Sequence, residues 1–142
     1  MAGLYFEEFY VDQKFEHPWG RTITESDNMM FSCLTLNVQP LHIDADFASR
    51  TEWGKPLVNS LFTLGTTVAN LGMTDIRFPK PLFHGDTIRV RTSVKSVRES
   101  KSRPKAGIVE FEHVAVNQHK EVVAICVRQA LMHKRSVLDT VQ

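Results

Sequence analysis

Hydrophobic and polar residues alternate with a period of two along the second half of the chain, which is typical of strands with one buried face. In residues 86–98, isoleucine and valine alternate with threonine, arginine and lysine, and residues 107–117 repeat the pattern. Residues 121–132 form a longer, largely apolar run, and polar turns separate the three segments. The pattern predicts an antiparallel meander. The predicted strands are, in chain order, residues 15–23, 76–78, 86–98, 107–117 and 121–132.

The first half of the chain has a helical pattern. Residues 59–72 carry no charge and place leucine and valine at helical spacing, so we expect a buried helix there. Asn59 or Ser60 is suited to cap its start, and Gly72 to end it. One shorter helix is predicted to start near Thr24, with Ser26 or Asp27 as its cap, and to cover residues 28–34. A further turn is predicted at residues 44–50.

An uncharged helix and a long-stranded antiparallel meander predict an α+β fold in which the sheet wraps around the helix. This is the hotdog architecture. We expect one such domain over residues 1–142, with residues 136–142 as a loose tail. A single unit leaves sheet edges and apolar surface uncovered, which predicts a homodimer or a dimer of dimers.

Composition and charge narrow the function. The 142 residues suit one domain, and 17 basic against 16 acidic residues give a net charge of +1, unlike most nucleic-acid binders. The N-terminus lacks a signal-peptide pattern, and no apolar stretch approaches the roughly 20 residues that span a bilayer. Cys33 and Cys126 sit in apolar surroundings and are predicted to be core residues of a cytoplasmic protein. No metal-ligand spacing and no glycine-rich nucleotide motif is present, so we expect neither metal nor cofactor.

One polar constellation stands out, from Asn37 through Gln39, Pro40 and His42 to Asp44. Pro40 is expected to end any preceding helix and to fix an extended turn, so that His42 lies on a rigid corner. A histidine flanked by an amide and a carboxylate can position a water and move its proton near neutral pH. The spacing by itself also fits a surface histidine after a proline turn.

These residues resemble the signature of the MaoC-like, (R)-specific enoyl-CoA hydratases and dehydratases, which is roughly Gly-Asp-x-Asn-Pro-x-His. The resemblance continues through residues 54–65 and 78–88. The aspartate of the pattern falls on Asn37, its asparagine on Gln39, and a glycine at the start of the central helix on Ser60. In these departures the chain is most similar to the subgroup of mesaconyl-CoA and itaconyl-CoA hydratases, which act on branched C5 dicarboxylyl thioesters.

The resemblance implies reversible addition of water across the 2,3 double bond of an enoyl-CoA thioester, with coenzyme A as part of the substrate. His42 would be the base, Asn37 would orient the water, and the backbone N–H of Ser60 would bind the thioester oxygen. Because an amide cannot accept the proton, His42 alone or Asp44 would act as the acid. Substrate contacts are assigned to Gln39, Pro40, Asn59, His84 and Arg103.

Several assignments stay open in the sequence. The basic segment that holds Arg98, Lys101, Arg103 and Lys105 is either a solvated loop or a site for coenzyme A phosphates. His113 and His119 are expected at solvent-facing or turn positions. A substrate carboxylate could meet Arg21, Arg50 or Arg77, and the acyl pocket could include Phe47, Trp53, Phe62 or Met73. A hotdog thioesterase, or an acyl-CoA binder without activity because of Asn37, are the alternative functions.

Overall fold

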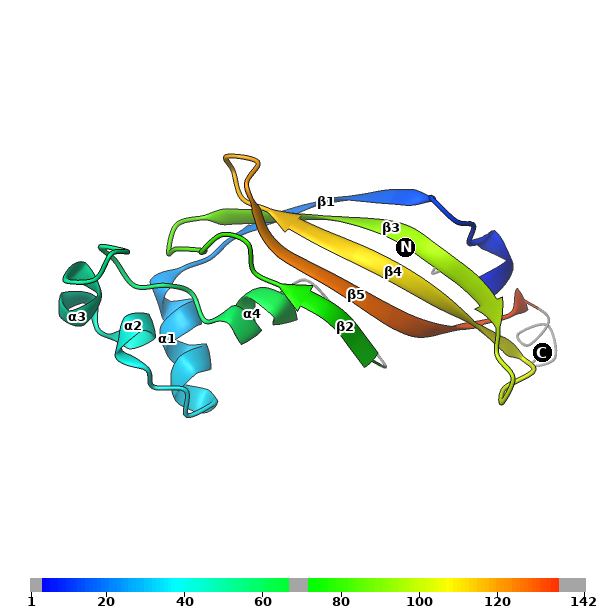
Figure 1. The fold of residues 1–142 in the computed structure, drawn as a ribbon, viewed down its shortest axis with the longest axis horizontal. Helices are drawn as coiled ribbons and strands as arrows, with labels where there is room; N and C mark the ends of the chain where they lie inside the picture. Colours follow the sequence, from blue (N-terminus) through cyan, green and yellow to red (C-terminus); the bar gives the residue numbers. More distant parts are fainter. Residues whose placement is uncertain (1–3, 67–71, 136–142) are drawn as a thin grey trace.

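The computed structural model describes residues 4–66 and 72–135. One antiparallel sheet forms the long body of the molecule, and short helices gather at one end of it (Figure 1). The predicted α+β class is confirmed. The elements are η1 (Phe6–Glu8), β1 (Lys14–Thr22), α1 (Glu25–Leu34), α2 (Pro40–Ile43), α3 (Ala45–Ser49), α4 (Ser60–Gly65), β2 (Gly72–Arg77), β3 (Thr87–Glu99), β4 (Ala106–Val116) and β5 (Val122–His133).

The sheet has the strand order β1-β3-β4-β5-β2. The predicted meander of three long strands forms its centre, and β1 and β2 are its two edges (Figure 1). Gly107, the first residue of the predicted strand 107–117, lies inside β4, which begins one residue earlier. A side chain at Gly107 would come within 2.0 Å of the Phe6 ring, so glycine allows η1 to pack on the sheet.

One face of the sheet carries the buried side chains, in two hydrophobic clusters. The cluster nearer the helices contains Ile23, Val58, Leu82, Ile88, Ala115, Val123 and Ala124. The cluster nearer η1 contains Phe6, Val94, Val109, Phe111 and Ala130. Polar residues separate the two, because Thr92 pairs across the strands with His113, and His113 with Cys126.

His113 is buried, with 4% of its surface exposed, so the prediction of a solvent-facing or turn position was wrong. Arg128 Nε donates to His113 Nε2 at 2.7 Å, and His113 Nδ1 lies 2.8 Å from Thr92 Oγ1. Thr92 Oγ1 is also 2.8 Å from His17 Nε2. Because arginine only donates, His113 Nε2 accepts, and Nδ1 of the neutral ring donates to the Thr92 hydroxyl. His119, by contrast, is exposed in the β4–β5 turn, as expected.

The predicted helix over residues 59–72 is shorter in the structure. The described helix α4 ends at Gly65, and residues 67–71 lie outside the described chain. Gly72 begins β2, so it does not terminate a helix, and the strand predicted at residues 76–78 starts four residues earlier. Leu61 is 58% exposed, so α4 is not buried all round. The threonine and valine residues of this uncharged stretch suit a strand as well as a helix.

The helices at the end of the sheet have well-defined starts. Thr24 Oγ1 accepts from the Asp27 backbone N–H at 3.1 Å, and Asp27 Oδ2 accepts from the Thr24 N–H at 3.0 Å. This capping box begins α1 and lowers the pKa of Asp27, chiefly through the hydrogen bond from the Thr24 backbone. Pro40 occupies the first position of α2, so it starts a helical turn instead of fixing an extended one.

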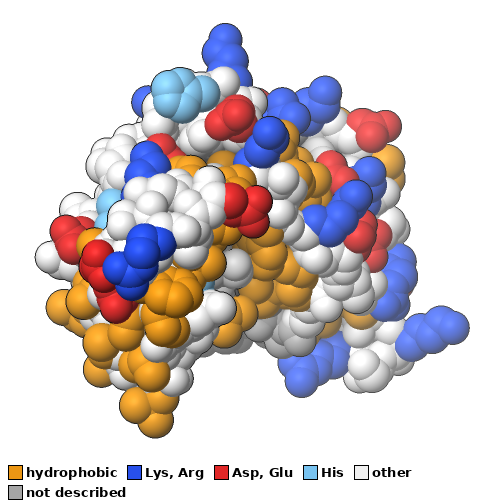
Figure 2. Space-filling model, turned by 60° about the vertical axis from the view of Figure 1, so that its left-hand side comes forward, with side chains coloured by type: hydrophobic (Ala, Val, Ile, Leu, Met, Phe, Trp, Pro, Cys, Tyr) orange, Lys and Arg blue, Asp and Glu red, His pale blue; other side chains and the backbone are white. Residues whose placement is uncertain are grey.

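Hydrophobic side chains gather on one part of the surface at this helical end, at the lower left of Figure 2. Its exposed hydrophobic side chains, here called the α1–α4 apolar surface, are Met30, Leu34, Leu36, Val38 and Leu61. Cys33 is exposed on α1, so its assignment to the core was wrong, whereas Cys126 is buried as predicted. No helix within residues 4–66 and 72–135 has the length and apolar character needed to cross a membrane.

Candidate active site

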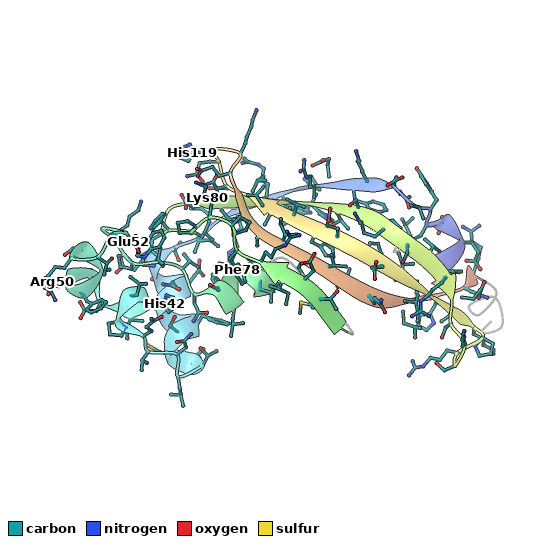
Figure 3. The ribbon with its side chains drawn as sticks, in the orientation of Figure 1. His42, Arg50, Glu52, Phe78, Lys80 and His119 are labelled. Atoms are coloured by element: carbon teal, nitrogen blue, oxygen red, sulfur yellow. The ribbon has the colours of Figure 1, made fainter. Side chains whose placement is uncertain are left out.

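A hollow with a volume of about 240 Å³ contains His42. We call it the His42 pocket. It lies between the helical end and the start of the sheet (Figure 3). Its lining residues are His42, Trp53, Leu57, Val58, Ser60, Thr63, Phe78, Pro79, Lys80, Pro81, Leu82 and Val123. Four residues were proposed for the acyl pocket. Trp53 lines the His42 pocket, whereas Phe47, Phe62 and Met73 do not.

The His42 ring is held in one tautomer. It is 9% exposed, and its Nδ1 lies 3.0 Å from the Leu57 carbonyl oxygen. Because a carbonyl oxygen only accepts, Nδ1 carries the proton and Nε2 carries the lone pair. Nothing in the described part of the chain hydrogen-bonds to Nε2. A basic nitrogen without a protein partner is therefore available to a ligand in the His42 pocket.

Asn28 holds the surroundings of His42 in place. This side chain is fully buried, and its Nδ2 lies 3.0 Å from the His42 carbonyl oxygen and 3.1 Å from the Leu57 carbonyl oxygen. Its Oδ1 accepts from the Asn59 backbone N–H at 2.8 Å. One amide thus connects α1, the backbone of the predicted base, the carbonyl that orients its ring, and the start of α4.

His84 belongs to the same network. Its Nε2 lies 3.0 Å from Asn28 Nδ2, which can only donate, so Nε2 accepts. Burial lowers the pKa of His84, which favours this neutral form. His84 is half-buried and lies outside the lining of the His42 pocket. It was predicted as a substrate contact, and in the structure its visible contact is with Asn28.

Local backbone contacts explain why these segments meet. The Leu57 N–H donates to the Leu41 carbonyl at 3.0 Å, and the Val58 N–H donates to the Leu82 carbonyl at 2.9 Å. Residues 57–58 are thereby fixed between α2 and the segment before β3. This placement puts the Leu57 carbonyl beside the His42 ring. Because the two residues are 15 positions apart, the sequence motif around His42 does not indicate this contact.

The start of α4 provides a backbone donor. Asn59 is 1% exposed and caps the helix, since its Oδ1 accepts from the Leu61 N–H at 3.0 Å. Its side chain is therefore committed to the helix and does not line the His42 pocket. Ser60 does line the pocket, and its backbone N–H has no hydrogen-bond partner among the residues described.

Asn37 does not line the His42 pocket. It is half-buried, and its backbone N–H donates to the Ser32 carbonyl at 2.9 Å while the Leu36 N–H donates to the Cys33 carbonyl at 3.1 Å. These two bonds form a Schellman motif at the end of α1, with Leu36 in the left-handed conformation at φ 55°. A glycine would adopt this conformation at lower cost, and the family pattern has glycine at the corresponding position.

The other residues of the motif have structural contacts. Asp44 is exposed and caps α3, because its Oδ1 accepts from the Phe47 N–H at 2.9 Å. Gln39 and Pro40 are exposed at the start of α2. No aspartate or glutamate of the described residues lines the His42 pocket. The structure thus brings His42 and Ser60 together, and it does not bring Asn37 or Asp44 to them.

The basic side chains proposed for substrate binding lie elsewhere. Arg103 is exposed in the β3–β4 turn, and β3 has 13 residues, so within one protomer roughly 40 Å of strand separates that turn from the His42 end. The three arginines considered for a substrate carboxylate are each paired with a nearby acid. The pairs are Arg21 with Asp27, Arg50 with Asp46 and Arg77 with Asp75.

The arrangement suits proton transfer in an apolar pocket. His42 Nε2 can take a proton from a water or return it to carbon, and the Ser60 N–H can donate to an oxygen that gains negative charge. The remaining walls are mostly apolar, which limits the access of bulk water and strengthens both interactions. Sequence reasoning identified His42 and Ser60 but missed Asn28 and Leu57. The polar pair Asn28 and Ser32, four residues apart on one helix, was the available signal for a buried polar face.

The chain resembles proteins whose names describe such chemistry. A family model described as a MaoC-like domain matches residues 8–117. The chain is 32% identical to a β-methylmalyl-CoA dehydratase of Chloroflexus aurantiacus and 28% identical to a mesaconyl-CoA hydratase of Cereibacter sphaeroides. Each alignment covers 94% of this chain, but only 41% and 42% of the two relatives, so the chain spans about two-fifths of their length.

The architecture is also found in a solved structure. A Mycobacterium tuberculosis protein described as having a double hotdog fold superposes with a TM-score of 0.78, at 22% identity. The superposition covers 93% of this chain and 44% of that protein. The predicted hotdog architecture is confirmed at the level of the fold.

Proposed function

The chain belongs to the MaoC-like dehydratase family, and from this premise we propose that it adds water to, or removes it from, the 2,3 double bond of an enoyl-CoA thioester. The observation that carries the proposal is the state of His42. Its Nδ1–H is held by the Leu57 carbonyl, its Nε2 has no hydrogen-bond partner among the described residues, and its ring lines a pocket whose other walls are mostly apolar. A general base needs this combination of a fixed ring and an accessible nitrogen.

In the hydration direction, His42 Nε2 takes a proton from a water whose oxygen attacks the β-carbon. Electrons of the double bond move toward the thioester carbonyl, and the Ser60 N–H donates to its oxygen. The protonated imidazole then delivers the same proton to the α-carbon, which restores neutral His42 and completes the addition of one water. Dehydration follows the reverse path.

We assign both proton transfers to His42. The absence of a carboxylate from the described lining of the pocket supports this assignment, and so does the commitment of Asp44 to capping α3. Asn37 does not line the His42 pocket of one protomer. It would contact the water only if the binding of substrate or of a second protomer brought the two together.

The proposed substrate is a short or branched enoyl-CoA, in the first instance a C5 dicarboxylyl thioester. The names of the two relatives support this choice, as does the asparagine at position 37. The His42 pocket, at about 240 Å³, is small for a long acyl chain.

We further propose that the protein works as a homodimer in the cytoplasm. The α1–α4 apolar surface is exposed in one protomer, and among the described residues no further strand lies beside the edge strands β1 and β2. The hotdog protein from Mycobacterium contains more than twice the length that this chain matches. In a homodimer, a second copy of this chain would take the place of the other half of that double hotdog fold. Light scattering after size-exclusion chromatography tests the dimer, and Leu34→Glu should yield monomers.

The proposed activity is tested with purified protein and a panel of unsaturated CoA thioesters that includes mesaconyl-CoA and itaconyl-CoA. Loss of the enoyl-thioester ultraviolet absorbance, abolished in His42→Ala, is the expected result. Thiol release with the double bond retained would instead identify a thioesterase. Equal, background-level turnover by wild type and His42→Ala would contradict the proposal. In that case a large gain from Asn37→Asp would identify an acyl-CoA binder that lost activity with its carboxylate.

A further inference from the structure

A second hollow adjoins the His42 pocket. It has a volume of about 370 Å³, and we call it the outer pocket. The two hollows share Trp53, Lys80 and Pro81 in their walls. In Figure 3, Lys80 lies between His42 and His119, the latter at the far side of the outer pocket. The outer pocket is lined by Trp53, Lys55, Lys80, Pro81, Phe83, Asp86, Asn117, His119 and Glu121.

Two ammonium groups in the outer pocket have no acidic partner. None of the ion pairs or side-chain hydrogen bonds found in residues 4–66 and 72–135 involves Lys55 or Lys80. Lys55 Nζ instead lies 4.4 Å from the centre of the Phe83 ring. Both lysines are exposed, so each keeps its charge available to an anion entering from solvent.

The two carboxylates of the outer pocket are already engaged. Asp86 accepts from the Phe83 N–H at 2.9 Å and from Gln118 Nε2 at 2.7 Å. Glu121 accepts from Asn117 Nδ2 at 2.9 Å. These bonds hold the acids to the turns that precede β3 and β5, and neither carboxylate forms an ion pair with Lys55 or Lys80.

Aromatic surface completes the outer pocket. Trp53 is 38% exposed and Phe83 is half-buried, and both contribute to its wall. Aromatic side chains with exposed surface can contact a planar base, and neighbouring lysines can meet phosphate groups. A pocket with this chemistry, opening from a catalytic one, suits the nucleotide end of a long carrier arm.

We propose that the outer pocket binds the phosphate-bearing end of coenzyme A, with Lys80 and Lys55 meeting the phosphates while the thioester lies beside His42. This inference rests on the proposed function, because it takes coenzyme A to be the carrier. It replaces the basic β3–β4 turn as the phosphate site within one protomer, since that turn lies at the opposite end of β3.

The test is calorimetric binding of free coenzyme A, which needs no turnover. Wild type should bind coenzyme A more tightly than pantetheine, which lacks the phosphates and the base. Lys80→Ala should weaken coenzyme A binding about fivefold to tenfold, Lys80→Glu more than tenfold, and Lys55→Ala by a smaller factor. Binding of pantetheine should be the same in all of these variants.

Arg103→Ala is the matched control, because it removes one positive charge from the alternative phosphate site. Its affinity for coenzyme A should equal that of wild type. The inference is overturned if Arg103→Ala loses affinity while the lysine variants do not. It is also overturned if the lysine variants lose affinity equally for pantetheine, or if wild type binds coenzyme A no better than pantetheine.

The two proposals can fail separately. A protein that turns over no thioester but binds coenzyme A in a Lys80-dependent way would contradict the hydratase activity and support the outer pocket. Full turnover with an unchanged KM in Lys80→Glu would support the hydratase activity and contradict the outer pocket as the phosphate site. His42→Ala should bind free coenzyme A like wild type, since its ring is assigned to the reacting atoms.

Discussion

Two buried histidines of this protein are held in opposite ways. His42 donates through Nδ1 to a backbone carbonyl and leaves Nε2 without a protein partner in the described residues, whereas His113 has both ring nitrogens engaged, by Thr92 and Arg128. The first ring can exchange a proton with a ligand, and the second connects three strands of the sheet. Burial alone therefore does not identify a reactive histidine. The deciding property is whether one nitrogen remains unpaired toward a pocket.

Exchanging each histidine for alanine should give the largest difference. His42→Ala should lower kcat/KM for a suitable enoyl-CoA about 10²–10⁴-fold, because a general base is lost, while the free energy of unfolding changes little. His113→Ala should leave kcat/KM per folded molecule near wild type. Turnover and urea unfolding measured on both variants check this. Equal loss of activity in the two variants would remove the distinction between the rings.

Asn28 should affect both activity and stability. Asn28→Ala removes the donor to the His42 and Leu57 carbonyls and the acceptor for the Asn59 N–H, so unfolding should become easier by about 1–3 kcal/mol per buried group left unpaired. Turnover should fall because the ring loses its support.

Asn28→Asp provides the sharper comparison. It keeps the acceptor for Asn59 but places carboxylate oxygens against two carbonyls, so kcat should fall while α4 keeps its start. Ser32→Ala, at a neighbouring buried position of α1, is the control for general damage to this helix. Wild-type kcat in Asn28→Asp would show that Asn28 does not position His42.

A smaller effect is expected from His113, whose protonation should make the free energy of unfolding depend on pH. Burial, with Arg128 and His17 nearby, lowers the pKa of His113 from 6.5 to about 4. Between these values the unfolded chain binds a proton that the folded chain does not, so stability is present above pH 6.5 and is lost as pH falls toward 4. The contribution to the slope is at most about 1.4 kcal/mol per pH unit.

Urea unfolding of wild type and His113→Gln from pH 7 to pH 4 measures that contribution by difference. The variant should lose less stability than wild type over this range. Parallel curves would mean that the imidazole is protonated as readily in the folded protein as in the unfolded chain.

The smallest effect concerns Cys126, which pairs across the strands with His113 and is fully buried. Burial raises the pKa of its thiol. In a Cys33→Ser protein, the remaining thiol should react with a maleimide more than about tenfold more slowly in the native state than in denaturant. Equal rates would show that solvent reaches the centre of the inner face.

The strands were predictable because their evidence is local. Alternating side chains in residues 86–98 and 107–117 determine which face is buried, whatever lies across it. The same alternation places His113 on the buried face with Phe111 and Ala115. The prediction was wrong because a histidine was expected to face solvent. The uncharged stretch after Asn59 contains no charged residue or proline that marks where a helix ends, and in the structure α4 ends at Gly65 while Gly72 begins β2.

The sequence by itself determined the α+β class, the strands and the family, and it singled out His42 as the candidate base, because each depends on residue order over a short span. The tertiary structure decided which nitrogen of His42 is basic, that Asn28 and the Leu57 carbonyl support it, that Asp44 caps a helix, and that Lys80 rather than Arg103 lies beside the pocket. These outcomes depend on which segments meet across long separations in the chain. Hydrogen-bond direction and distance do not exist until those segments are packed together.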